Sequence, residues 1–260
     1  MSRLIDRFES AAKQSVQPLG FRTSKTAAPL PGFLLIAQSV PDTLKDHTEI
    51  ATADAVLLRH GGELPAPKYI EKIIETVGKT PVGLYLQDAD DDDIARLTEA
   101  GCDFFVFTSA SRYVAAPPEG DKKPGRFLEI ESSMDDMLLR AVNGLPVDAF
   151  FALDTYKGGA LTWKELMVFQ KLAAMFGKPL IINLPFNATE SEIKAIYEAG
   201  IDGAVVDTGA MEKGGLQRLQ EIIRKLPAKS ARKRSKVDIT LPRASSPSAP
   251  PPDEEEEEDE

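Results

Sequence analysis

Three acidic residues stand at the carboxyl-terminal ends of short apolar segments, where they could do acid/base or metal chemistry. They are Glu131, Asp154 and Asp207. Clustered carboxylates either hold a divalent cation through oxygen ligands or share a proton, so that one of them acts as general acid or base. We therefore predict these three as catalytic residues, with an unidentified divalent cation as the candidate cofactor. The alternative role for each is a hydrogen bond to a neighbouring loop.

Four more polar residues at the ends of such segments predict an anion-binding set. Arg59 carries a permanent positive charge, and the adjacent His60 adds a titratable imidazole. Gln87 and Asn183 alternate with apolar neighbours, which turns their side chains away from the apolar face of each segment. We predict that these four residues bind the substrate.

The seven polar residues named above lie at one end of a single barrel if the apolar segments that precede them are its strands. Amphipathic stretches separate most of the segments, and in one of them Ile70, Ile73, Ile74 and Val77 show the spacing of a buried helical stripe. Strands that alternate with helices pair in parallel. Eight such units in roughly 200 residues predict an α/β fold, the (β/α)8 TIM barrel, with its site at the carboxyl-terminal ends of the strands. The predicted strands are residues 33–39, 55–60, 82–87, 104–109, 127–132, 149–155, 180–184 and 203–208. The predicted helices are residues 68–77, 91–100, 134–145, 162–176, 191–199 and 216–226.

Similar joints between helix and strand recur in the two halves of the chain and support a closed barrel. Glu-Ala-Gly-Cys-Asp at residues 99–103 precedes the fourth predicted strand, and Glu-Ala-Gly-Ile-Asp at residues 198–202 precedes the eighth. A barrel built from two half-barrels would leave such a repeat four units apart. The alternative is that every helix-to-strand turn favours a Gly cap followed by a short polar residue.

The Glu-Ala-Gly-x-Asp joints resemble those of the aldolase-type barrels, which bind phosphorylated or otherwise anionic metabolites. The resemblance covers all eight units and implies a lyase-like or aldolase-like enzyme. Two features of class I and phosphate-binding members are missing. No strand-end Lys that could form a Schiff base is identified, and Leu-Pro-Phe-Asn-Ala at residues 184–188 stands where a Gly-rich phosphate loop would follow strand 7. The resemblance therefore indicates a superfamily and no specific family.

A carboxylate inside the barrel is the most informative single residue. Leu128 and Ile130 form the apolar face of their segment, so Glu129 must point into the barrel. An unpartnered carboxylate there would cost several kcal/mol, so Glu129 is either partnered or protonated. Three interpretations stay open: a polar network that only fixes the core, a functional carboxylate with a shifted pKa, and an error in the strand register. The predicted neighbours of Glu129 are Tyr85, Asn183, Gln38 and Arg59.

One helix of the barrel is expected to be missing. Residues 110–125, between the fourth and fifth predicted strands, contain Pro117, Pro118, Gly120, Pro124 and Gly125, a composition that replaces the helix with a Pro-rich loop. We expect this loss to expose Phe105 and Phe107 on the outer face of the fourth strand. An exposed apolar patch usually marks a partner, which predicts a homodimer through the strand 4 to strand 5 face. The alternative is that the Pro-rich loop folds over the gap.

Composition limits the remaining possibilities. The chain has 260 residues, 42% hydrophobic and 28% charged, close to the averages of soluble globular proteins. The single cysteine, Cys102, excludes an intramolecular disulfide framework and fits a reducing compartment. The first residues lack the apolar region of a secretory signal, and no apolar run is long enough to cross a bilayer, so we expect a cytoplasmic protein without a membrane partner. The net charge of −10 makes nucleic acid a poor partner.

The chain divides near Pro227. Residues 1–226 form the predicted barrel domain. Residues 227–260 begin with a basic cluster and end with an acidic run at 253–260, a composition that predicts a disordered tail. The leading functional hypothesis is a lyase-like or aldolase-like enzyme acting on a small anionic metabolite, phosphorylated ones included, through carboxylates at the barrel rim. The alternative is a non-catalytic TIM barrel that works by binding or as a scaffold, because this fold by itself implies no reaction.

Overall fold

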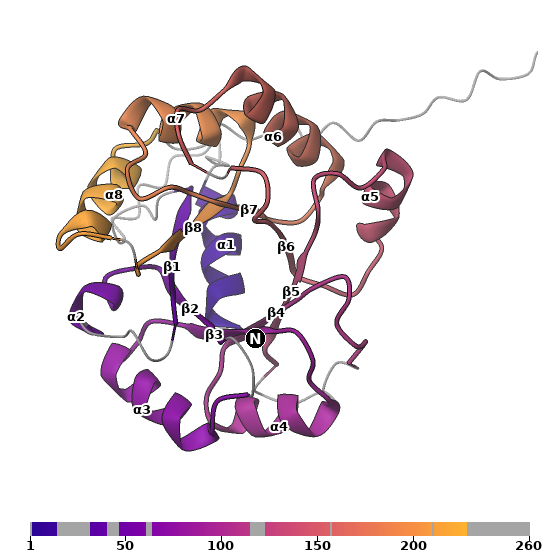
Figure 1. Ribbon diagram of the computed structural model, residues 1–260, viewed down its shortest axis with the longest axis vertical. Helices are drawn as coiled ribbons and strands as arrows, with labels where there is room; N and C mark the ends of the chain where they lie inside the picture. Colours follow the sequence, from indigo (N-terminus) through magenta and orange to yellow (C-terminus); the bar gives the residue numbers. More distant parts are fainter. Residues whose placement is uncertain are drawn as a thin grey trace, which may run out of the picture.

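Eight parallel strands close into a barrel in chain order, with β1 pairing to both β2 and β8 (Figure 1). The computed structural model describes residues 2–14, 32–40, 47–60, 64–114, 123–156, 158–209 and 211–227, and every structural statement concerns these ranges. The strands are β1 Leu34–Ser39, β2 Ala55–Arg59, β3 Val82–Leu86, β4 Phe104–Phe107, β5 Gly125–Glu129, β6 Ala149–Ala152, β7 Leu180–Asn183 and β8 Gly203–Asp207. The helices are α1 Arg3–Gln14, α2 His47–Ile50, α3 Pro67–Val77, α4 Asp91–Glu99, α5 Asp136–Val142, α6 Trp163–Met175, α7 Glu190–Ala199 and α8 Gly215–Arg224. The predicted (β/α)8 barrel is confirmed.

Helix starts follow the capping residues that the sequence provides. Asp90, Thr162 and Thr189 each accept a hydrogen bond from a backbone N–H in the first turn of α4, α6 and α7, and an acidic side chain three residues later completes a capping box. These caps satisfy backbone donors that would otherwise lack partners. The six predicted helices are all present, and α5 is shorter at both ends than the sequence suggested.

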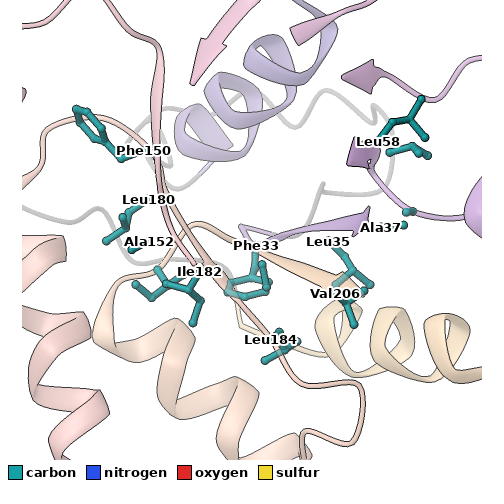
Figure 2. Packing of buried hydrophobic residues seen from close by; sticks show 14 of the residues in the cluster. Phe33, Leu35, Ala37, Leu58, Phe150, Ala152, Leu180, Ile182, Leu184 and Val206 are labelled. Carbon is teal, nitrogen blue, oxygen red and sulfur yellow. The ribbon is translucent and has the colours of Figure 1, made fainter. Parts of the chain in front are cut away.

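Side chains alternate between an inner and an outer apolar layer. The outer layer lies between the strands and the helices, and Figure 2 shows part of it around Phe150, Leu180 and Ile182. The inner layer fills the barrel, and its rings at Phe104, Phe127 and Phe151 pack with centroids 5.1 and 5.5 Å apart. The predicted alternation along β3, β5 and β7 is therefore correct.

Helix α1 closes the end of the barrel at which the strands begin. In Figure 1 it lies across the middle of the ring of strands. Leu4 and Phe8 belong to the inner apolar layer, and the guanidinium of Arg7 donates to the backbone carbonyl of Asp54, one residue before β2. This helix is not among those that the sequence pattern predicts. Because α1 covers the amino-terminal end, the carboxyl-terminal ends of the strands are left for a site.

The connection between β4 and β5 has no helix in its described residues, as predicted, yet the expected exposure of the strands is wrong. Phe105 is fully buried, and Phe107 is partly buried. The residues directly after β4 turn back over the outer face, because Val114 is buried in the outer layer and its carbonyl accepts a 2.5 Å hydrogen bond from Arg126. The homodimer predicted through this face thereby loses the exposed patch that motivated it.

Several sequence expectations fall outside the described ranges. The predicted tail, with its basic cluster and acidic run, is among them, as are Pro117, Pro118 and Gly120 of the Pro-rich loop. The division of the chain near Pro227 therefore stays a prediction. In the described ranges no helix is long and apolar enough to cross a membrane.

Candidate active site at the carboxyl-terminal end of the barrel

Polar side chains replace apolar ones in the last inner layer of the barrel. Arg59 ends β2 and Glu129 ends β5, while Tyr85 is the next-to-last residue of β3. Arg59 follows the inward-facing Ala55 and Leu57 at alternate positions, so it too faces inward. Three strands thus place a cation, a phenol and a carboxylate at the end of the barrel where (β/α)8 proteins carry their sites.

Glu129 has the partner that its position requires. The hydroxyl of Tyr85 donates a hydrogen bond to Oε2 of Glu129. Tyr85 is almost fully buried, and that burial, followed by the hydrogen bond and negative charge of Glu129, raises the pKa of Tyr85 far above its ordinary value. The phenol therefore keeps its proton, and that proton is held by Glu129. The predicted strand register is correct, and Tyr85 is one of the neighbours that the sequence indicated.

Arg59 lies over the face of the same phenol. Its Cζ is 4.5 Å from the centroid of the Tyr85 ring, and the two residues are direct partners in the pairing of β2 with β3. A guanidinium in this position gains a cation–π attraction while its N–H groups at the edge stay available to a ligand. Within the described ranges the structure shows no hydrogen bond or ion pair from this guanidinium to the protein.

The other three predicted binding residues stand at or directly after the ends of β7, β2 and β3. Asn183 faces inward at the end of β7, and its Nδ2 donates a 3.1 Å hydrogen bond to the carbonyl of Tyr156. His60 follows Arg59 and is half-buried, and Gln87 follows β3 and is exposed. Asn183 therefore holds the segment after β6, while Gln87 stands at the solvent edge.

The three predicted catalytic carboxylates each bond to a nearby loop. Asp154 accepts from the backbone N–H and the hydroxyl of Ser132, with the hydroxyl 2.9 Å away, and so joins the segment that follows β6 to the segment that follows β5. Asp207 is exposed and accepts from the N–H of Gly209 at 2.8 Å. Glu131 is exposed, and the hydroxyl of Ser133 lies 3.4 Å from its Oε2.

These carboxylates do not form a metal site with one another. In the part of the chain that the structure describes, no group of three or more His, Cys, Asp or Glu side chains is arranged to hold a metal ion. The alternative that the sequence left open for each carboxylate, a hydrogen bond to a loop, is what their contacts show. Their catalytic role stays a prediction.

Carboxylates of the protein itself lie near the starts of α7 and α8, the helices that follow β7 and β8. Many (β/α)8 barrels bind phosphate in this region. After β7, the carboxylate of Glu192 accepts from the N–H of Leu161 and from the N–H of Thr189, and these two hydrogen bonds lower the pKa of Glu192. After β8, the N–H of Gly214 at the start of α8 donates to the carboxylate of Glu49 at 2.8 Å. The backbone N–H groups of the capping residues of α7 and α8, Thr189 and Gly214, are therefore already partnered by the protein's own carboxylates.

The arrangement can bind an anion and accept a proton. Arg59 supplies the charge for the anion, and Glu129 is a carboxylate whose orientation is fixed by Tyr85. None of the eight strands contains a lysine, so no strand residue can form a Schiff base with a carbonyl substrate. Glu129 and Tyr85 are not among the residues that the sequence predicts for the site, although alternation along β3 and β5 places both inside the barrel.

Comparison with known proteins identifies the fold. No protein-family profile matches the sequence, and no curated protein sequence matches it. Among solved structures, a mutant tryptophan synthase alpha-subunit from Pyrococcus furiosus is similar, with a TM-score of 0.55 at 11% identity over 75% of this chain and 98% of that one. A protein from Aquifex aeolicus VF5 has a TM-score of 0.55 at 11% identity over 86% of this chain and 97% of that one. Mycobacterium tuberculosis tryptophan synthase has a TM-score of 0.53 at 14% identity over 86% and 96%. These likenesses show the fold, an eight-stranded parallel (β/α)8 barrel, and no specific family.

Proposed function

We propose that the protein is an enzyme that binds a small anionic metabolite at the carboxyl-terminal end of the barrel and works by acid/base chemistry. The single observation that carries the proposal is the contact of one phenol, Tyr85, with both Glu129 and Arg59. Glu129 and Arg59 are both partly buried charged groups at the end of an apolar barrel, and within the described ranges the guanidinium has no protein hydrogen bond, so a ligand would give both groups a partner. The fold likeness to tryptophan synthase alpha-subunits supports a lyase-like or aldolase-like reaction.

Each residue has a distinct role in this proposal. Arg59 binds the anionic group of the substrate. Glu129 accepts a proton from the substrate, and Tyr85 is a positioning residue that holds Oε2 of Glu129 and leaves Oε1 to the ligand. The remaining predicted residues complete the rim of the site: His60, Gln87, Asn183, Glu131, Asp154 and Asp207.

Ligand-induced stabilisation tests the binding part of the proposal. A ligand at 100 times its Kd should add roughly 2.7 kcal/mol to the free energy of unfolding. We expect thermal-shift screening with carboxylated and phosphorylated metabolites to find a stabilising anion, and Arg59→Met to abolish the shift. Arg140→Met, which changes an exposed arginine on α5, is the matched control and should keep the shift. A stabilising anion that binds Arg59→Met equally well would place the site elsewhere.

Turnover of the stabilising ligand tests the chemical part. Incubation with the purified protein, followed by NMR of the ligand, should show product with the wild type and a loss of at least about a hundredfold in rate with Glu129→Gln, because general acid/base residues typically contribute that much. Equal rates for the two proteins would remove Glu129 from the chemistry.

The second candidate is a non-catalytic barrel that only binds its ligand. The absence of lysine from all eight strands, and of a metal-holding group from the described ranges, favours it. Under this alternative Arg59→Met still abolishes binding, but the bound ligand is recovered unchanged by NMR from both wild type and Glu129→Gln.

A further inference from the structure

We propose that Asn143 is a site of spontaneous deamidation, and that conversion of its amide to a carboxylate weakens the contact between α5 and α6. Asn143 precedes Gly144, and neither of the chain's other two asparagines, Asn183 and Asn187, precedes a glycine. A glycine leaves the amide carbon of the preceding asparagine open to attack by its own backbone nitrogen. The inference does not depend on the proposed function, because Asn143 follows α5 at the end of the barrel where the strands begin.

The side chain of Asn143 connects the ends of two helices. Asn143 is the residue that ends α5, and its Nδ2 donates a hydrogen bond to the backbone carbonyl of Met175, the last residue of α6. Its Oδ1 accepts a 3.1 Å hydrogen bond from the backbone N–H of Gly177. One amide therefore supplies a donor and an acceptor to the α5–α6 contact, and a carboxylate cannot replace it because a carboxylate has no proton to donate.

The folded structure slows the reaction without excluding it. The reaction needs the Gly144 nitrogen, without its proton, beside Cγ of Asn143. In the structure that N–H donates a 3.0 Å hydrogen bond to the carbonyl of Ala141, and the backbone of Asn143 is helical, at φ −59° and ψ −29°. The last turn of α5 must therefore open first. Because α5 has 7 residues, and Gly144 and Leu145 after it are exposed, this turn should open at a low cost in free energy.

The chemical step balances with water as the only co-reactant. The Gly144 nitrogen gives its proton to a base in the solvent and forms a bond to Cγ of Asn143. The bond from Cγ to Nδ2 then breaks, and Nδ2 takes up a proton and leaves as ammonia. Water opens the resulting five-membered succinimide ring at one of its two carbonyls. One opening gives aspartate, and the other gives isoaspartate. No group is oxidised or reduced.

The aspartate product places negative charge where the structure disfavours it. The carbonyl of Met175 loses its donor, while the N–H of Gly177 keeps an acceptor. The new charge also lies at the carboxyl-terminal ends of α5 and α6, which carry the negative ends of the helix dipoles. A 2.6 Å hydrogen bond from Nζ of Lys178 to the carbonyl of Leu145 does not involve the amide and is kept. The α5–α6 contact is therefore weakened and not abolished.

Peptide mapping by mass spectrometry, after incubation in warm and mildly alkaline buffer, tests the reaction. In native wild type we expect deamidation at Asn143 at a rate at least about tenfold below that of the same protein unfolded in urea, because the helix end must open first. Asn187 is the internal control: it is exposed but precedes Ala188, and it should stay unmodified in the native protein. Gly144→Ala should suppress the reaction and keep the fold, since an added Cβ would lie 3.5 Å from the carbonyl oxygen of Ala141, an ordinary contact.

Urea denaturation tests the consequence for stability. Asn143→Asp has the side chain of the aspartate product and should unfold at a lower urea concentration than the wild type. Asn187→Asp makes the same change at an exposed position outside the α5–α6 contact, so it is the matched control and should unfold as the wild type does. After incubation in the same buffer, the wild type should lose stability, whereas Gly144→Ala should keep its denaturation midpoint.

The inference is overturned by any of the following results. Equal rates at Asn143 and Asn187 in the native protein, or an unchanged rate at Asn143 in Gly144→Ala, would mean that the Gly144 nitrogen is not the attacking group. A native protein that stays unmodified long after the unfolded protein has reacted completely would mean that the end of α5 does not open. Equal rates in native and unfolded protein would mean that the last turn gives no protection. Wild-type stability in Asn143→Asp would mean that the α5–α6 contact does not need the amide.

Discussion

The hydroxyl of Ser2 donates a 2.7 Å hydrogen bond to the carboxylate of Asp103, which stands 101 residues further along the chain and directly before β4. The same carboxylate accepts from the backbone N–H groups of Arg3 and Leu4, at 2.8 and 3.0 Å. These N–H groups belong to the first turn of α1 and have no partner within the helix. Asp103 thus caps a helix from a distant part of the sequence and fixes α1 over the amino-terminal end of the barrel.

Removal of this cap should destabilise the protein measurably. We expect Asp103→Ala to lower the free energy of unfolding by about 2 to 3 kcal/mol, because buried N–H and hydroxyl donors lose a charged acceptor. Asp103→Asn keeps one acceptor oxygen and should cost less. Urea denaturation of both variants measures the difference. Asp136→Ala, which removes an exposed partner of Lys171, is the control and should change the free energy by less than about 1 kcal/mol. An equally small effect at Asp103 would show that α1 is not held by this contact.

The stability of two Glu129 variants tests the geometry of the site independently of any ligand. Glu129→Gln keeps an acceptor for the Tyr85 hydroxyl and should be nearly neutral. Glu129→Leu leaves that buried hydroxyl without its acceptor, and we expect a loss of about 1 to 3 kcal/mol. Denaturation midpoints measure both. Equal and negligible effects would contradict the placement of Glu129 inside the barrel.

The interior of the barrel should tolerate no side chain at Gly83. A Cβ atom at this position would overlap the ring of Phe104, which packs on Phe127 in the inner layer. We expect Gly83→Ala to cost about 1 to 3 kcal/mol, the usual range for overpacking a filled core. Gly177→Ala, where an added Cβ meets no atom within 4 Å, is the control for the loss of a glycine. If the two variants unfold at the same urea concentration, the inner layer is less tightly packed at Gly83 than the structure shows.

The fold was predictable because it depends on patterns that recur along the chain. Eight apolar segments alternate with amphipathic ones, and each strand exposes one face to the helices and one to the interior, so even the inward direction of Glu129 and Asn183 follows from their neighbours. Helix α1 was missed because its partners are not local. Its apolar residues Leu4 and Phe8 pack into the end of a barrel whose strands lie elsewhere in the sequence, and its cap comes from Asp103.

The site was predictable only in part, for a related reason. Sequence position shows which polar residues reach the carboxyl-terminal ends of the strands, and it brought Arg59, Tyr85 and Glu129 to the same layer. Sequence position does not show which partner each polar side chain hydrogen-bonds to. Asp154 is committed to Ser132, and Asp207 accepts from Gly209, contacts that depend on loop geometry. The expectation that Phe105 is exposed was wrong for the same reason, because the chain after β4 turns back and places Val114 over the strand.

The thiol of Cys102 should stay protonated and unreactive in the native protein. Burial, with a further contribution from the negative charge of Asp103, raises the pKa of Cys102 from 9.0 to about 12. Because the thiolate is the reactive form, we expect native protein to react very slowly with a chromogenic disulfide at about pH 8 and to release one thiol equivalent once unfolded in urea. Rapid reaction of the native protein would show that the joint between α4 and β4 opens readily.

The same shift makes stability depend on alkaline pH in a direction that can be checked. Between pH 9.0 and about 12 the unfolded thiol loses its proton while the folded one keeps it, so the folded state binds more protons and the free energy of unfolding falls as the pH rises. The contribution is fully present below pH 9.0 and declines by at most about 1.4 kcal/mol per pH unit above it. Other groups titrate in this range too, so the quantity to measure is the difference between wild type and Cys102→Ala at about pH 8 and about pH 10.5. We expect the advantage of the wild type over Cys102→Ala to shrink at the higher pH. A difference that is constant between the two pH values would mean that the thiol ionises as easily in the folded protein as in the unfolded chain.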